Sequence, residues 1–160
     1  MAFLLRALRP QIVLTLPYEG GHPDHDATAF AVHAARRLLE QQGILPPILI
    51  EMTSYHNSAK GIEVYDFLPC AACQITTCVL TEAERALKRR LLDCFPTQHQ
   101  TLSLFPVEIE RFRPAPRYCF TEPPHEAQLF YENFPWGMTG ERYRSLARQA
   151  MEALGIAGGI

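Results

Sequence analysis

Residues 11–53 read QIVLTLPYEGGHPDHDATAFAVHAARRLLEQQGILPPILIEMT, and their pattern predicts the centre of the fold. Its first part, over 11–16, is rich in β-branched and aliphatic residues and is followed by proline, which predicts a buried strand. In residues 25–43, apolar side chains recur at four-residue spacing up to a closing glycine, which predicts a helix. The stretch PPILIEMT (46–53) predicts a second strand. Because strand, helix and strand follow one another, we expect an α/β fold with a parallel sheet and flanking helices.

The rest of the chain continues the α/β pattern. Residues 62–68 and 75–80 are candidates for further short strands. Thr81 and Glu84 form a capping-box pattern, which predicts the start of a helix that Pro96 ends.

Prolines dominate the segment from 106 to 135, which holds six of the 13 prolines in the chain. We expect this segment to form no long regular element and to wrap over the sheet, where it helps to wall a pocket. A last helix is expected over 139–154.

Composition limits the class of protein. The chain has 160 residues, of which 48% are hydrophobic and 20% charged, and this indicates a single globular domain over 1–160. A net charge of −2 gives no basic surface for nucleic acid. No apolar run reaches the roughly 18 residues of a membrane span. The five cysteines, an odd number, argue against a closed disulfide framework and favour a reducing compartment, so we expect a cytoplasmic protein.

The loop between the first strand and the helix concentrates polar side chains. A glycine pair at 20–21, which allows a sharp turn, is followed by His22, Asp24, His25 and Asp26. In an open α/β sheet, ligands bind where strands end and helices begin. Neutral imidazole is a common zinc ligand, and a nearby aspartate can orient the ring. The loop is therefore a candidate metal or catalytic site, with a polar loop and helix cap as the alternative.

The loop also carries a resemblance to a known family. PYEGGHPDHDAT (17–28) closely resembles the second signature of the LmbE-like, or PIG-L, deacetylases, which hydrolyse N-acetyl groups of amino-sugar conjugates. Residues 80–98 look like that family's helix ending in a Ser/Thr-Gln step, and residues 111–147 look like the C-terminal region of one bacterial branch. The resemblance implies a Rossmann-like LmbE-type sheet and a small glycoconjugate as substrate. A homo-oligomer is compatible with it.

The resemblance implies roles for three residues of the loop. His25 matches the family's zinc-ligating histidine, with iron as the alternative metal. His22 matches the histidine that stabilises the oxyanion or protonates the leaving amine, and Asp24 matches the aspartate that holds this histidine. We therefore expect an amide hydrolase with Zn²⁺ bound at His25 and with His22 and Asp24 as catalytic residues.

The family's first signature, Ala-His-Pro-Asp-Asp-Glu, is absent from the sequence. In the family it follows the first strand and supplies the other two zinc ligands and the general base. We therefore expect the chain to correspond to the C-terminal part of the family's domain, without its N-terminal strands. The strand over 11–16 should then lack a neighbour on one side, and Ile12 and Leu14 should be poorly covered. The alternatives to an active enzyme are a truncated or degenerate member without activity and a metal-binding module built on His22, His25 and nearby acids.

Other acidic and histidine residues have structural interpretations. Asp24 is also a candidate N-cap of the helix, and Asp26 is expected to be a surface acid that complements the helix dipole. His33 and His99 are expected at the surface or the edge of the core. His125 is expected in a surface loop, with pocket lining as the alternative.

Cysteines and tryptophan are likewise given structural roles. Cys70, Cys73 and Cys78 are expected to be buried or incidental thiols, because no fourth metal ligand follows at a suitable spacing. Trp136 is expected to anchor the core, with a sugar-stacking platform as the alternative.

Overall fold

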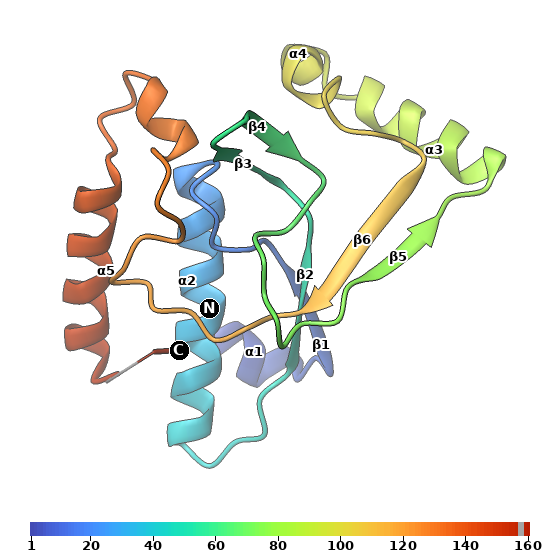
Figure 1. Cartoon of the computed structure of the whole chain (residues 1–160). Coiled ribbons are helices and arrows are strands. Elements are labelled where there is room, and N and C mark those ends of the chain that lie inside the picture. Colours follow the sequence, from blue (N-terminus) through green and yellow to red (C-terminus); the bar gives the residue numbers. More distant parts are fainter. Residues whose placement is uncertain (157–158) are drawn as a thin grey trace.

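The computed structural model describes residues 1–156 and 159–160. Its centre is the predicted β–α–β unit, in which β1 (Ile12–Thr15) leads through α2 (Pro23–Gln41) to β2 (Ile48–Met52). The two strands pair in parallel over their length. Both strands, the helix between them and their parallel pairing are confirmed (Figure 1).

The sheet has four strands in the order β1-β2-β6-β5 and is mixed. β6 (Ile109–Pro114) runs antiparallel to β2, and β5 (Thr76–Val79) runs antiparallel to β6. The expectation of a wholly parallel sheet is therefore wrong, and so is the expectation that 106–135 forms no long regular element. β6 can form because Pro106 precedes the strand and Pro114 is its last residue, so that no proline interrupts the ladder.

The remaining elements surround this sheet. They are α1 (Ala2–Leu8), the hairpin strands β3 (Tyr55–Ser58) and β4 (Gly61–Val64), α3 (Glu82–Asp93), the 3-10 helices η1 (Pro96–Gln98) and η2 (Phe130–Asn133), α4 (His99–Leu102) and α5 (Gly140–Leu154). The predicted capping box of Thr81 and Glu84 at the start of α3 is confirmed, as is the last helix. β5 confirms the predicted strand over 75–80, whereas β4 covers only the beginning of the strand predicted over 62–68.

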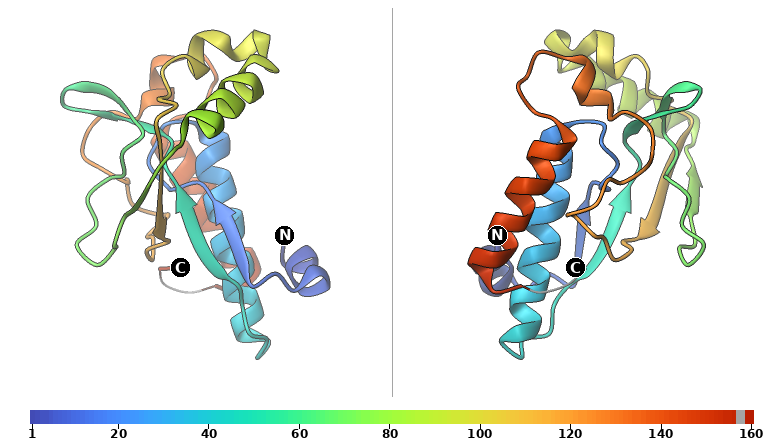
Figure 2. Two further views of the ribbon diagram at one scale, coloured as in Figure 1. Left: turned by 90° about the vertical axis from the view of Figure 1, so that its right-hand side faces the viewer. Right: turned by 60° about the vertical axis from the view of Figure 1, so that its left-hand side comes forward.

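The helices α2 and α5 lie on the same side of the sheet, where α2 packs on the strands and α5 packs beside α2 (Figures 1 and 2). The core between them combines aromatic rings with small side chains, which are Tyr18, Ala29, Ala34, Phe120, Tyr143, Ala147 and Met151. The alanines let the helices approach closely. The Tyr143 hydroxyl on α5 also donates a hydrogen bond of 2.7 Å to the backbone oxygen of Asp26, which fixes the first turn of α2 against α5.

The opposite face of the sheet is open over β1 and β2 in the described residues (Figure 2). Ile12, Leu14 and Ile48 point to this face and are 56%, 57% and 60% exposed. β1 is also an edge strand, paired only with β2. The predictions that β1 lacks a neighbour on one side and that Ile12 and Leu14 are poorly covered are both confirmed. An uncharged edge strand beside exposed aliphatic side chains favours association with another surface.

Among the described residues, no helix combines the length and the hydropathy that a membrane crossing requires.

Candidate active site

The polar loop lies at the carboxyl end of β1 and leads directly into α2, as predicted. Its two glycines are required by the backbone. Gly20 has φ of 72°, in the left-handed region that favours glycine. At Gly21, an added Cβ would lie 1.9 Å from the backbone oxygen of Tyr55. The loop therefore packs directly against the start of β3, and only glycine allows this approach.

Asp26 holds the loop from inside the protein. Its Oδ1 accepts hydrogen bonds from the backbone N–H groups of Glu19 (3.2 Å) and Gly20 (3.1 Å). The side chain is buried, and burial raises the pKa of this carboxyl to about 7 against the opposing effect of the two hydrogen bonds. The expectation that Asp26 is a surface acid is wrong, because the loop folds back over the first turn of α2 and covers its carboxyl group.

His22 is the N-cap of α2, and its Nδ1 accepts a hydrogen bond of 3.1 Å from the backbone N–H of Asp24. Asp24 is therefore not the N-cap, because the helix begins at Pro23, two residues earlier than that role requires. Its carboxylate is exposed and lies 3.9 Å from Nδ1 of His22. Asp24 thus orients the His22 ring through its backbone N–H. Since Nδ1 is the acceptor, the neutral ring of His22 carries its proton on Nε2.

His25 follows in the first turn of α2, and its Nδ1 lies 3.1 Å from the hydroxyl oxygen of Ser54, the residue before β3. The ring centroids of His22 and His25 are 5.2 Å apart. Burial, reinforced by the neighbouring His22, lowers the pKa of His25 to about 4, although Asp24 acts in the opposite direction. At neutral pH the His25 imidazole is therefore uncharged, which is the form that binds metals.

Aromatic side chains frame the two histidines. The ring centroid of Trp136 lies 4.9 Å from that of His22. The indole also stacks on the Phe134 ring, with a centroid distance of 4.5 Å and an interplanar angle of 11°. Tyr55 meets the His25 ring edge-on at 5.6 Å. Trp136 is 49% exposed, so the expectation that it anchors the core is wrong. The loop after η2 carries it to the rim of the site instead.

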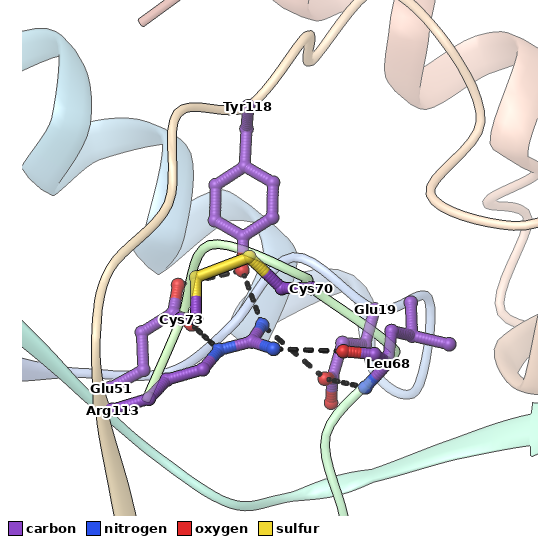
Figure 3. Close-up of a disulfide and its surroundings, with 7 residues drawn as sticks. All are labelled: Glu19, Glu51, Leu68, Cys70, Cys73, Arg113 and Tyr118. Atoms are coloured by element: carbon purple, nitrogen blue, oxygen red, sulfur yellow. Dashed lines mark hydrogen bonds and ion pairs between the residues drawn. A yellow bond between two sulfur atoms is a disulfide. The ribbon is translucent and has the colours of Figure 1, made fainter. Parts of the chain in front are cut away.

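A buried ionic network lies behind the loop and was missed in the sequence (Figure 3). Arg113 on β6 donates from Nε to Glu51 on β2 (2.8 Å) and from Nη1 to the backbone oxygen of Leu68 (2.8 Å). The Tyr118 hydroxyl donates to Glu51 (2.7 Å), and the Leu68 N–H donates to Glu19 (2.9 Å). The network ties the loop to the middle of the sheet. The available signal was Glu51, a lone acid in the apolar strand ILIEM.

The segment after Leu68 is closed by a disulfide between Cys70 and Cys73 (Figure 3). The expectation of incidental thiols is wrong for this pair, because a turn brings the two residues together, with Cys73 N–H donating to Cys70 O at 3.1 Å. Cys78 is a free, exposed thiol.

The other histidines lie in three different environments. His33 is buried against the rings of Tyr118 and Phe120, which corrects the expectation of a surface or core-edge position. It is buried because α2 turns this side chain toward the core that α5 closes. His125 is half-buried, with Nε2 3.1 Å from the backbone oxygen of Glu19, and so supports the back of the loop. His99 is exposed on α4, as expected.

The site offers part of a metal-binding set. His25 has a neutral ring with Nδ1 held by Ser54, and its Nε2 makes no hydrogen bond within the described residues. These properties fit a zinc ligand. In the part of the chain that the structure describes, no three His, Cys, Asp or Glu side chains come together as a group that could hold a metal ion. Compared with protein-family models, with curated proteins and with solved structures, the chain shows no match.

Proposed function

We propose that this chain contributes the His22–His25 part of a zinc-dependent hydrolase that removes an N-acetyl group from an amino-sugar conjugate. The observation that supports this most is the state of His25, whose neutral ring is held at Nδ1 by Ser54 while Nε2 stays free of internal hydrogen bonds. The ring also lies just beyond the carboxyl end of a parallel strand, where open α/β sheets bind ligands. The resemblance of 17–28 to the second signature of the LmbE-like deacetylases supports the same chemistry.

Zinc would polarise the amide carbonyl and lower the pKa of a water molecule. Catalytic zinc sites use about three protein ligands and one open position. His25 fits one of these ligands, and the described residues bring together no group of three. The remaining ligands and the general base would have to come from outside the described residues. Iron is the alternative metal, since imidazole and carboxylate ligands also suit it.

His22 would act on the substrate directly. Its Nδ1 is occupied by the Asp24 amide, so its Nε2 carries the proton that can be donated to a carbonyl oxygen as negative charge develops there. To protonate the departing amine, His22 would first have to gain a second proton on Nδ1, so that the imidazolium gives up its Nε2 proton and returns to the neutral ring. The Asp24 carboxylate, 3.9 Å from Nδ1, could approach the ring further by a side-chain rotation and stabilise the imidazolium that a complete cycle requires.

A second candidate is a protein that keeps this fold without catalytic activity. The absence of a three-ligand group among the described residues favours it. The two candidates differ in one respect that can be measured, because only the hydrolase gains activity when the missing ligands are supplied.

Location and assembly belong to the same proposal. We propose a cytoplasmic location because the number of cysteines is odd. In that compartment, cellular thiols would reduce the Cys70–Cys73 disulfide. The open face around Ile12 and Leu14 supports a homo-oligomer.

The deciding experiment compares this chain with one extended at its N-terminus by a strand and the Ala-His-Pro-Asp-Asp-Glu signature. Zinc content and amine release from methyl N-acetyl-β-glucosaminide are measured for both. We expect weak zinc binding and no measurable release from the chain alone, and a gain of both in the extended chain. If the extended chain gains neither, the non-catalytic candidate is favoured. If the chain alone releases amine, the proposal that ligands are missing is wrong.

A further inference from the structure

An exposed aromatic stack borders His22. The indole of Trp136 lies nearly parallel to the Phe134 ring at 4.5 Å, and Phe130 meets Phe134 edge-on at 5.3 Å. Phe134 covers one face of the indole, yet 49% of Trp136 remains exposed. A large part of the indole surface beside His22 is therefore open to a ligand.

The indole of Trp136 lies outside the buried core. Trp136 belongs to neither of the two buried hydrophobic clusters found in the described residues. Its loop is held through hydrogen bonds to backbone groups instead. The Arg142 guanidinium donates to the backbone oxygen of Gly137 at 2.8 Å, and the backbone N–H of Trp136 donates to the backbone oxygen of Phe134 at 2.8 Å. Exposing a large aromatic surface to water is unfavourable. The arrangement is explained if a ligand covers the indole.

The groups around the indole suit one kind of ligand. The Asp24 carboxylate is 88% exposed and lies 3.9 Å from Nδ1 of the same histidine. An aromatic face beside a free carboxylate complements a pyranose ring, which has an apolar C–H face and hydroxyl donors at its edge. The ring centroids of Trp136 and His22 are 4.9 Å apart and those of His22 and His25 are 5.2 Å apart, so an acylamino substituent of a pyranose ring on the indole would reach both histidines.

We infer that Trp136, supported by Phe134, binds the C–H face of a pyranose ring and thereby sets which amides reach His22 and His25. The inference rests on the proposed function and adds a specificity-determining residue to it.

The binding test uses the metal-free chain, so that its outcome does not depend on hydrolysis. Trp136 is the only tryptophan in the sequence, and its fluorescence and indole N–H resonance report on this site alone. Methyl N-acetyl-β-glucosaminide should shift the emission to the blue and move the resonance saturably. N-acetylethanolamine, which has the amide without the ring, should do neither. The inference is overturned if the glycoside causes no change, if the acyclic amide causes the same change, or if adenosine binds more tightly than the glycoside.

Variants separate stacking from other effects, with affinity for the glycoside measured by calorimetry. Trp136→Ala should weaken binding about tenfold, whereas Trp136→Phe should retain most of it. Phe95→Ala removes an exposed aromatic ring next to α3 and should change nothing. Circular dichroism and urea midpoints show that each variant is folded. Unchanged affinity in a folded Trp136→Ala variant overturns the inference.

The outcomes also separate this inference from the proposed function. Glycoside binding that depends on Trp136, without hydrolysis by the extended chain, supports the inference and contradicts the hydrolase. Hydrolysis by an extended chain whose KM is unchanged by Trp136→Ala supports the hydrolase and overturns the inference.

Discussion

The Nδ1 atom of His25 lies 3.1 Å from the hydroxyl oxygen of Ser54, which joins the first turn of α2 to the residue before β3. A hydroxyl at this distance fixes the ring and leaves the other nitrogen for a ligand. In metal sites, such a partner fixes the orientation and the tautomer of the ligating histidine and thereby raises metal affinity.

Replacing Ser54 by alanine should therefore weaken metal binding. In the chain extended by the first signature, Ser54→Ala should lower zinc affinity by about 10- to 100-fold, because the His25 ring loses its orienting partner. Competition with a chromophoric chelator measures the effect. Ser145→Ala, a serine of α5 away from the loop, serves as the control. Equal affinities of the Ser54→Ala and Ser145→Ala proteins would show that Ser54 does not orient the ligand.

The ion pair of Arg113 and Glu51 should be sensitive to loss of one partner. Both side chains are almost fully buried, and Arg113→Met leaves the Glu51 carboxylate without its cation. The expected loss of unfolding free energy is about 3–5 kcal/mol. Urea denaturation measures it. Arg36→Met, which removes a half-exposed partner of Glu40, should cost less than about 1 kcal/mol. A loss of similar size for both variants would contradict the role given to the buried network.

Acid should destabilise the fold partly through His33. Burial, with help from Arg36, lowers the pKa of His33 to about 4 in the folded chain, whereas an unfolded histidine has a pKa of about 6.5. The unfolded state therefore binds the proton first, and stability falls as the pH drops from about 6.5 toward 4. Once the pH lies below about 4, where the folded state is protonated too, the loss from this residue reaches about 3 kcal/mol.

The variant His33→Phe removes this titration. The difference in unfolding free energy between the two proteins, measured at several pH values, should shift in favour of the variant below pH 6.5. A difference that stays constant between pH 7 and pH 4.5 would show that His33 titrates normally.

The open sheet face should drive self-association. Leu14 is 57% exposed on an uncharged edge strand, so Leu14→Lys should shift the chain toward the monomer in sedimentation experiments. Leu154→Lys, at the end of α5, should leave the distribution unchanged. A chain that is monomeric at high concentration before any substitution would contradict this prediction.

The sequence predicted the β–α–β unit because its pattern is local. The aliphatic strands β1 and β2 and the periodic helix α2 follow one another, and the glycine pair at 20–21 marks the turn between them. β6 was missed because its partners lie far away in the sequence and its burial depends on them. Arg113 looks like a surface residue until Glu51, 62 positions earlier, is placed opposite it.

The site was predicted for its position and in part for its geometry. The closeness of His22 and His25 follows from their spacing at the start of α2. The positions of Ser54 and Trp136 beside the histidines could not be predicted, because Ser54 and the loop after η2 reach the histidines only through tertiary packing. The burial of Asp26 was missed for the same reason, since the loop that covers it folds back over its own helix.

The most direct test of the account is the zinc affinity of the extended chain with and without His25. We predict that His25→Ala abolishes stoichiometric zinc and amine release together, because each of the few ligands is needed to fix the metal. His22→Ala should keep the zinc and slow release by about 10²–10³, the usual cost of losing one oxyanion donor. Unchanged zinc content and unchanged amine release in the His25→Ala protein would contradict the account.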